Sequence, residues 1–285
     1  MKQYDSNLLS EELANKHRAL RDNIRSMGRV VVAFSGGIDS SLVAHVAATE
    51  LGENALIATS GSASLKRSDL SLTQHLATRW KLNHRVITTD ELNKNEYRAN
   101  PTNRCFYCKT SLYTALQEIA ENENYNYILN GTNTDDLGDH RPGLQAASDF
   151  DIRSPLVETE FCKNDIRALA EYLELENAQK PQAACLSSRF PYGSHITCER
   201  LAQVEEAEDV LAALGFTQYR VRHHEDVARI EIVAQEMPHA IEVAGVIDER
   251  VRACGYRFVS LDLGGFRSGA LNEGVIPAVQ IHEPA

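Results

Sequence analysis

One stretch, residues 30–41, constrains the fold more than any other. It opens with the apolar residues Val-Val-Val-Ala-Phe and continues as Ser-Gly-Gly-Ile-Asp-Ser-Ser. The apolar run is typical of a buried parallel strand, and the small and apolar residues from Leu42 onward predict a helix. A glycine-rich turn between a strand and a helix is a ready anion site, because free backbone N–H groups and the helix dipole favour negative charge there. The sequence therefore predicts a phosphate-binding loop.

Two well-known nucleotide motifs do not match this turn. No Lys-Ser or Lys-Thr pair closes it as in a Walker A loop, and the third glycine of a Rossmann turn is missing. The string Ser-Gly-Gly-x-Asp-Ser resembles the loop of the PP-loop (ATP pyrophosphatase) superfamily, whose members split ATP between its α- and β-phosphates and adenylate a substrate. The resemblance implies catalytic roles for Ser35 and Asp39. It implies ATP contacts at Ala33, Ser35, Gly36, Gly37, Asp39, Ser40, Ser41 and Thr59. A Gly-Gly turn without a ligand is the alternative.

Short apolar runs alternate with helical patterns along the first two thirds of the chain. Strands are expected at 30–34, 55–59, 84–87 and 125–129, and helices at 7–27, 66–80 and 164–175. This alternation predicts an α/β fold with a doubly wound parallel sheet. Residues 138–160 lack clear periodicity and are expected to form a loop. Ligands of such sheets bind outside the carboxyl ends of the strands, so a nucleotide is expected there.

The segment after the fourth strand, Gly131-Thr-Asn-Thr-Asp-Asp136, resembles a second PP-loop element. In such enzymes the chain approaches ATP at this point, which implies nucleotide contacts at Gly131 and Asp135. Mg²⁺ takes carboxylates, waters and substrate phosphates as ligands, so Asp135 or Asp136 is a candidate for holding the ion. A turn rich in Asn and Asp without a ligand is the alternative.

Composition and charge restrict the class of protein. The chain has 285 residues, a length that suits two domains, and its net charge of −11 disfavours a nucleic acid as the main partner. No apolar run approaches the length of about 18 residues that a membrane span needs, and the N-terminus lacks the apolar core of a signal peptide. We therefore expect a cytoplasmic protein with no membrane partner. In a reducing compartment its six cysteines are not expected to form disulfides.

A second, smaller domain is predicted after residue 195. The preceding stretch, 179–197, has two prolines and no apolar period. Beyond it the pattern predicts a helix at 197–214, strands at 217–223 and 226–233, a helix at 238–253 and a strand at 256–263. This order indicates a small α+β domain, so the predicted division is 1–195, 196–275 and a loose tail at 276–285. In the helix at 238–253, Ile241, Ala244, Ile247 and Val251 are expected to line one face.

The cysteines suggest a metal, cluster or redox site. Cys105-Phe-Tyr-Cys108 is a Cys-x-x-Cys pair, for which thiol exchange, zinc, an iron–sulfur cluster and coincidence compete. Cys185 is a natural third ligand, and three cysteines would leave one iron of a cluster open. Cys185 is also a candidate nucleophile, because Arg189 and Lys180 would favour its thiolate. Cys162, Cys198 and Cys254 fall in or beside helical patterns and are expected to be small core residues.

Arginines of the second domain are candidates for binding an anion. Alternating polar and apolar residues over 219–232 predict a hairpin with one wet face that carries Arg220 and Arg222, and Arg229 is expected to join them from the partner strand. Arginine forks suit bidentate contact with phosphate or carboxylate. The glycine-rich loop Leu261–Gly269 carries Arg267 at a strand end, which also suits an anion. A solvated sheet face is the alternative.

Together these stretches resemble the LarE family of ATP-dependent sulfur transferases. The resemblance covers about 25–270 and rests most specifically on Cys-Leu-Ser-Ser-Arg at 185–189 and Asp-Leu-Gly-Gly-Phe-Arg-Ser-Gly at 262–269. It implies that ATP and Mg²⁺ adenylate a carboxylate of pyridinium-3,5-biscarboxylic acid mononucleotide, and that sulfur then replaces AMP to give a thiocarboxylate for the nickel-pincer nucleotide cofactor. It implies substrate contacts at Arg189, Arg222, Arg229 and Arg267.

Two sulfur sources are known in the family. In one, the cysteine matching Cys185 gives up its own sulfur; in the other, three cysteines hold a [4Fe–4S] cluster that carries a transferable sulfide. The sacrificial members lack the Cys-x-x-Cys, so the resemblance favours a cluster on Cys105, Cys108 and Cys185 that is supplied by a sulfide donor. We also expect a homo-oligomer. A tRNA thiolase, an ammonia-using ligase and a non-catalytic nucleotide-binding protein are the competing hypotheses.

Overall fold

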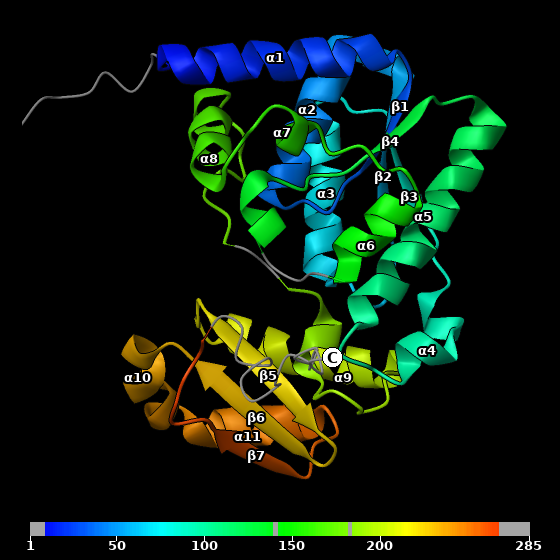
Figure 1. Ribbon diagram of the computed structural model, residues 1–285. Coiled ribbons are helices and arrows are strands. Elements are labelled where there is room, and N and C mark those ends of the chain that lie inside the picture. The colour runs from blue at the N-terminus through cyan, green and yellow to red at the C-terminus, as the bar shows by residue number, and fades with distance from the viewer. Residues whose placement is uncertain (1–8, 139–141, 182–183, 268–285) are drawn as a thin grey trace, which may run out of the picture. The chain divides into compact units, whose positions relative to one another are not determined.

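The computed structural model describes residues 9–138, 142–181 and 184–267 (Figure 1). The chain divides into two compact units, Met1–Cys185 and Leu186–Ala285, so this boundary falls earlier in the chain than the one proposed from the sequence. The tail at 276–285 lies outside the described residues. Among the helices of the described ranges, none is both long enough and apolar enough to cross a membrane.

The first unit is built on a parallel sheet of four strands. The strands are β1 (Val30–Ala33), β2 (Ala55–Ser60), β3 (His84–Ile87) and β4 (Tyr127–Leu129). Their order in the sheet is β3-β2-β1-β4, and every neighbouring pair is parallel. The chain therefore winds outward from β1 to β3 and returns on the other side of β1. The predicted doubly wound α/β fold is confirmed.

Helices cover both faces of this sheet. They are α1 (Glu11–Met27), α2 (Ile38–Leu51), α3 (Arg67–Arg79), α4 (Asn95–Arg98), α5 (Arg104–Glu123), α6 (Pro142–Asp149), α7 (Pro155–Glu158) and α8 (Lys163–Tyr172). Val30 and Val32 point into one core with α1, α2 and α8, whereas Val31 points into a second core with α5 and α6. The strands are apolar on both faces because both faces are covered.

The expected loop at 138–160 is wrong in part. Helices α6 and α7 lie within it, and α6 packs along α5 through the buried residues Ala146 and Ala147. Such short helices, with alanines as their buried side chains, leave little apolar periodicity to detect. The long helix α5 begins at Arg104, so Cys105 and Cys108 lie in its first turns.

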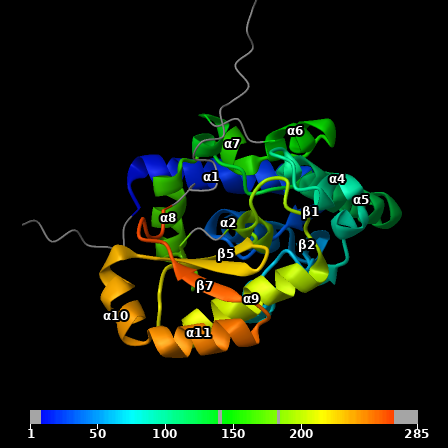
Figure 2. The ribbon, with the colours of Figure 1, turned by 90° about the horizontal axis from the view of Figure 1, so that it is seen from below.

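The second unit is a three-stranded sheet covered by helices. Its strands are β5 (Tyr219–His224), β6 (Val227–Ile232) and β7 (Phe258–Leu261), and its helices are α9 (Cys198–Ala213), α10 (Met237–Glu242) and α11 (Ala244–Ala253). β5 and β6 form an antiparallel hairpin, and β7 pairs with β6 in parallel. α9 and α11 lie side by side and share one apolar core with this sheet (Figure 2). The predicted α+β architecture is confirmed.

The single helix expected at 238–253 is two helices. α10 ends at Glu242 and α11 begins at Ala244, so the side chains on either side of Val243 do not share a face. Ile241 is 69% exposed and Ala244 is also exposed, so the prediction that these two residues lie on the buried face is wrong. Ile247 and Val251 are buried as expected.

Candidate functional site

The loop between β1 and α2 has the geometry of an anion site. Gly36 has φ +72°, a backbone conformation that side chains rarely adopt, so a glycine is required there. Gly37 caps α2, and among the described residues no side chain caps this helix end. The N–H groups of the first turn therefore remain available to a ligand. Ser40 Oγ accepts a hydrogen bond from Ser35 N at 3.2 Å and donates one to Gly37 O at 3.0 Å, which fixes the turn.

The chain after β4 packs directly against this loop. A Cβ atom on Gly131 would lie 2.6 Å from Ser40 N, so the two backbones are in contact and only glycine fits. β4 follows β1 in the sheet order, and the winding direction reverses at β1. Open α/β sheets bind ligands at such a reversal. The two segments singled out in the sequence therefore meet at the position where a nucleotide is expected.

Lys163 links these two segments, although no sequence motif singles it out. Its Nζ donates to both carboxylate oxygens of Asp39 at 2.6 Å, and its backbone N donates to Asp135 Oδ2 at 2.8 Å. Both side chains of the ion pair are about one quarter exposed, at 27% and 26%. An ammonium group held at the rim of the phosphate loop can turn to a bound phosphate. No local pattern marks it, because Asp39 is 124 positions away.

Asn177 also contacts the phosphate loop and was missed. Its Nδ2 donates to Gly36 O at 2.9 Å and to Ser41 Oγ at 2.7 Å, and the residue is 4% exposed. One buried amide thus holds the left-handed glycine and the start of α2 together. In the sequence it is an ordinary asparagine after α8.

Thr59 and Ala33 lie at strand ends beside the loop. Thr59 Oγ1 donates to Phe34 O at 2.9 Å and is 2.9 Å from His84 Nε2. The Thr59 hydroxyl, 1% exposed, therefore ties the carboxyl ends of β1 and β2 to the first residue of β3. Burial lowers the pKa of His84. Ala33 is the last residue of β1 and is half-buried.

Asp135 and Asp136 lie in a short 3₁₀ helix, Thr134–Gly138, after the contact at Gly131. Asn133 organises this turn, because its N–H donates to Asp136 Oδ2 at 3.1 Å and its Oδ1 accepts from Asp135 N at 3.0 Å. Within the described ranges, no group of three or more His, Cys, Asp or Glu side chains is arranged to hold a metal ion. A bound nucleotide would add phosphate oxygens to these carboxylates.

Two cysteines of the first unit, Cys105 and Cys185, act electrostatically on a third, Cys108. Cys105 and Cys185 are exposed, and Cys108 is half-buried. Burial raises the pKa of Cys108 to about 12, and the neighbouring Cys185, Glu91 and Cys105 add to the rise. The same three thiols, after Tyr113, raise the pKa of Lys109. The distant Cys185 is thus near the Cys-x-x-Cys pair.

The other cysteines differ from the expected core residues. Cys162 is half-buried and forms a capping box with Asp165 at the start of α8. Cys198 is exposed at the first position of α9, so its expected burial is wrong. Cys254 is half-buried against the core of the second unit.

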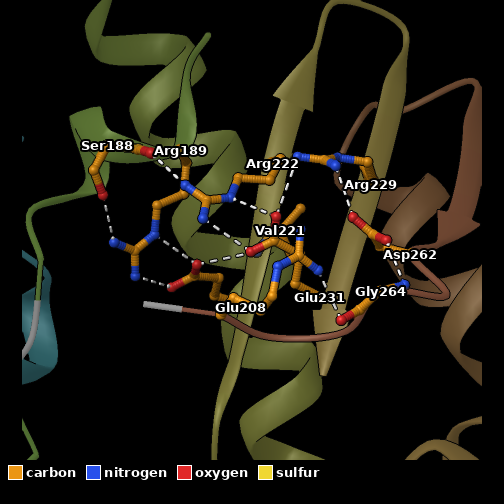
Figure 3. A network of polar contacts seen from close by, with 10 residues as sticks. Ser188, Arg189, Glu208, Val221, Arg222, Arg229, Glu231, Asp262 and Gly264 are labelled. Carbon is orange, nitrogen blue, oxygen red and sulfur yellow. Dashed lines mark hydrogen bonds and ion pairs between the residues drawn. The ribbon is translucent and has the colours of Figure 1, made fainter. Parts of the chain in front are cut away.

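The candidate arginines of the second unit have carboxylate or backbone partners (Figure 3). Arg222, 2% exposed, donates to both carboxylate oxygens of Glu231 at 3.0 and 2.9 Å. The other pairs are Arg189 with Glu208 at 2.8 Å, Arg229 with Asp262 at 2.7 Å and with Glu231 at 3.1 Å, and Arg267 with Gly264 O at 2.8 Å. The guanidinium of Arg222 is therefore already occupied by a carboxylate.

Arg220 differs from these residues. Its guanidinium lies 4.7 Å from the ring centroid of Phe266, and in the described part of the chain it forms no ion pair. Burial lowers its pKa, and the positive charges of Arg189 and Arg222 lower it further. Glu231 and Glu208, which pair with those two arginines, act on the pKa of Arg220 in the opposite direction. Arg220 is thus a partly desolvated cation with no carboxylate partner of its own in the described residues, a position that suits an anion.

Comparison with known proteins gives a family. The asparagine synthase family model matches residues 17–137, which include the phosphate loop and the contact at Gly131. The chain is 41% identical to an uncharacterized protein of Synechocystis sp. over 91% of this chain and 98% of that protein. It is 38% identical to the pyridinium-3,5-bisthiocarboxylic acid mononucleotide synthase of Lactiplantibacillus plantarum over 93% of this chain and 97% of that protein. An uncharacterized protein of Methanocaldococcus jannaschii is 31% identical over 84% of this chain and 91% of its own length.

These relatives match nearly the whole chain, whereas the family model covers the nucleotide-binding part alone. The geometry at the sheet edge and the matches agree on the use of ATP. The chain belongs to the LarE family of ATP-dependent sulfur transferases, within the PP-loop superfamily.

Proposed function

We propose that this enzyme transfers sulfur to a carboxylate of pyridinium-3,5-biscarboxylic acid mononucleotide after activating that carboxylate with ATP. The observation that carries the proposal is the 38% identity with the L. plantarum synthase, whose name gives a bisthiocarboxylic acid mononucleotide as its product. The product would serve the nickel-pincer nucleotide cofactor. The same likeness favours this substrate over the tRNA of a PP-loop thiolase. The six cysteines, all within the described residues, form no disulfide, which suits a reducing, cytoplasmic location.

The first step is an adenylation. An oxygen of the substrate carboxylate attacks the α-phosphorus of ATP, the bond from that phosphorus to the bridging oxygen breaks, and pyrophosphate leaves. Negative charge grows on the leaving group, where the free N–H groups at the start of α2 stabilise it. Lys163 would exchange Asp39 for a phosphate, which frees the Asp39 carboxylate. Asp39, Asp135 and Asp136 would then hold Mg²⁺, which adds positive charge beside the phosphates.

The second step replaces AMP by sulfur. A thiolate or hydrosulfide attacks the acyl carbon of the adenylate, a C–S bond forms, and AMP leaves. If Cys185 is the donor, a base then removes its Cα proton, the Cβ–Sγ bond breaks, and the residue becomes dehydroalanine. The protein would then be consumed in one turnover.

The Cys-x-x-Cys pair favours the other sulfur source. Cys105, Cys108 and Cys185 are three thiols of one compact unit, and both Cys185 and Cys105 contribute to the raised pKa of Cys108, as expected of neighbours. In the described ranges these thiols are not arranged around a single metal ion. Their chemistry would suit a [4Fe–4S] cluster, which takes thiolate ligands and, with three of them, leaves one iron open to bind sulfide. The three cysteines would hold the cluster, and a separate donor would supply the sulfide that is transferred.

Arg220 fits the substrate phosphate better than Arg222 does. The Arg222 fork is bidentate to Glu231, whereas Arg220 is half-buried on Phe266 and has two cationic neighbours. Arg267, on the same glycine-rich loop as Phe266, would complete the anion site. Arg189 and Arg229 would pair with Glu208, Glu231 and Asp262 and would not contact the substrate directly.

The experiment that tests the adenylation incubates the protein with ATP, Mg²⁺ and the biscarboxylic mononucleotide, and measures pyrophosphate and the mass of the product. We expect pyrophosphate release with the wild type and its loss in Asp39→Ala and Ser35→Ala. Wild-type ATP turnover by both variants would refute the site. ATP binding without pyrophosphate release under any substrate would indicate a non-catalytic protein.

The sulfur source is tested by iron and acid-labile sulfide on protein purified without oxygen. About four of each per chain are expected for one cubane cluster. Cys105→Ser should lose this iron and keep adenylation, while Cys254→Ser, which changes a thiol of the other unit, should keep both. Iron-free wild-type protein whose mass falls by one H₂S after a turnover would point to Cys185 as a consumed donor.

A further inference from the structure

The segment Leu186–Phe190 directly follows Cys185 and is tied into the second unit. It contains a short 3₁₀ helix, Leu186–Arg189, and the side chains of Leu186, Ser187, Arg189 and Phe190 are buried. This buried peptide directly follows the exposed Cys185, and specific contacts hold it in place. Two carboxylates from different elements do so, each through an arginine (Figure 3).

The first tie comes from the hairpin β5–β6. Arg222 Nη1 donates a hydrogen bond to the backbone carbonyl of Ser188 at 2.7 Å. The Nε and Nη2 of the same guanidinium donate to the two carboxylate oxygens of Glu231. The bidentate pair fixes the plane of the guanidinium, so its third donor is aimed at Ser188. Arg222 and Glu231 are 2% and 1% exposed.

The second tie comes from α9. Arg189 Nε and Nη2 donate to the two oxygens of Glu208 at 2.8 and 3.1 Å, and Glu208 is fully buried. Glu208 Oε1 also accepts a hydrogen bond from Val221 N at 3.1 Å, which anchors it to β5. The ring of Phe190 packs against that of His223, with 4.9 Å between the ring centroids.

A buried ion pair does little for stability when its whole cost is counted, because apolar side chains of similar volume often serve as well. Here the Arg222–Glu231 pair has another effect, because it holds the guanidinium so that one N–H donates to the backbone carbonyl of Ser188. We propose that Glu231 and Glu208 are positioning residues for Cys185: through Arg222 and Arg189 they hold the peptide from Leu186 to Phe190, and so fix the backbone that carries the thiol. The proposal rests on the proposed role of Cys185 in sulfur transfer.

The test uses the double variant Arg222→Met/Glu231→Leu in the full-length protein. It replaces the pair by apolar side chains of similar size and removes the donor to Ser188, while Arg229 keeps Asp262 as its partner. Hydrogen–deuterium exchange is measured by mass spectrometry without ATP or substrate. We expect exchange of the peptide covering 186–190 to rise by about five- to tenfold, the effect of losing one hydrogen bond, while β5, β6 and the Tm stay near wild type. A role in global stability alone would raise exchange throughout the unit.

Asp262→Asn is the matched control. It weakens the outer arm of the same network, Arg229–Asp262, and leaves Arg222, Glu231 and Ser188 in place. Exchange at 186–190 should match the wild type in this variant. Arg222→Lys keeps the charge opposite Glu231 but lacks the fork, so it tests the tie if the double variant fails to fold.

Unchanged exchange at 186–190 in a folded double variant, or in Arg222→Lys, would overturn the proposal. The measurement needs no turnover, so it is independent of the chemistry. If 186–190 loosens but the wild type forms no thiocarboxylate, the positioning stands and the proposed function fails. If thiocarboxylate forms but 186–190 does not loosen, the function stands and the positioning fails.

Discussion

The contacts within the phosphate loop of the first unit and the contacts within a network of ion pairs in the second unit span very different lengths of chain. This network consists of buried and half-buried ion pairs formed by Arg189, Glu208, Arg222, Glu231, Arg229 and Asp262. In the phosphate loop, Ser35 and Ser40 bond each other five positions apart. In the network, Arg189 meets Glu208 at a separation of 19 and Arg222 meets Ser188 at a separation of 34. The first is a local motif of backbone N–H groups, and the second is a set of charged side chains that the tertiary fold assembles.

The difference matters for assigning function to charged residues. The phosphate loop leads into a helix start that no side chain of the described residues caps, and so its motif indicates a ligand directly. An arginine in a strand pattern predicts a guanidinium group but not its partner, because a buried carboxylate such as Glu231 can already bind it. Arg222 and Arg220 lie two positions apart on β5. Only the structure shows that the Arg222 guanidinium pairs with Glu231, whereas that of Arg220 lies on the ring of Phe266.

The largest effect is expected in the network. Glu208→Gln removes the charge opposite Arg189, which is 6% exposed at its side chain. Breaking a buried pair on one side costs about 3–5 kcal/mol, because the remaining charge stays desolvated. Urea unfolding should therefore show a much lower midpoint than the wild type.

The control is Asp248→Asn, which breaks an exposed pair with Arg252 on α11. Exposed pairs contribute about 0–1 kcal/mol, so its midpoint should stay close to wild type. Equal losses in the two variants would mean that burial does not separate network pairs from surface pairs.

The next largest effect is expected in the phosphate loop. Gly131→Ala would place a Cβ atom 2.6 Å from Ser40 N, and two backbones would have to separate. A displacement of about 1 Å at a reacting group lowers rates by about a hundredfold, so pyrophosphate release should fall by that order. Steady-state pyrophosphate assays measure it.

Gly245→Ala provides the matched substitution. A Cβ there meets no heavy atom of the described residues within 4 Å, and the residue is helical. Alanine in a helix stabilises by about 0.5–1 kcal/mol relative to glycine, with no change in pyrophosphate release expected. Normal release by Gly131→Ala would show that the contact between the two segments is unimportant for ATP.

A third, smaller effect tests whether the phosphate loop is purely local. Asn177→Ala removes two buried hydrogen bonds, to Gly36 O and Ser41 Oγ. Each such bond contributes about 1 kcal/mol, so the loss of both should raise the KM for ATP by about thirtyfold while the fold persists. Asn177→Asp places an acceptor against the Gly36 carbonyl and should be worse than alanine. Equal KM values in all three proteins would leave the loop a purely local motif.

Much of the first unit could be predicted because its strands are apolar on both faces and its helices alternate with them. α5 was not assigned, since its buried positions include Arg104 and Ser111 beside Tyr113 and Leu116, which blurs the apolar period. The core of the site was predictable from Ser35–Ser41 and Gly131. Lys163 and Asn177 were not, because their partners lie 124 and 141 positions away and no local pattern links them.

The smallest expected effect concerns His84, which supports the phosphate loop through Thr59. Burial lowers the pKa of His84 from its usual 6.5, so the unfolded chain binds this proton more tightly than the folded protein does. Above that value both states are neutral, and as the pH falls below it the free energy of unfolding must decrease. His84→Gln removes this titration, so the fall in Tm between about pH 7 and pH 5 should become shallower.

His45 separates this acid effect from the loop. Burial lowers its pKa as well, but its ring packs against Trp80, 5.5 Å away between centroids, and not against Thr59. His45→Gln should therefore flatten the acid limb in the same way while the KM for ATP stays unchanged. His84→Gln should also raise that KM, because Thr59 loses the partner that holds its hydroxyl toward Phe34 O. If both variants affect Tm and KM alike, the strand-end bond does not support the phosphate loop, and the loop is as self-contained as its motif suggests.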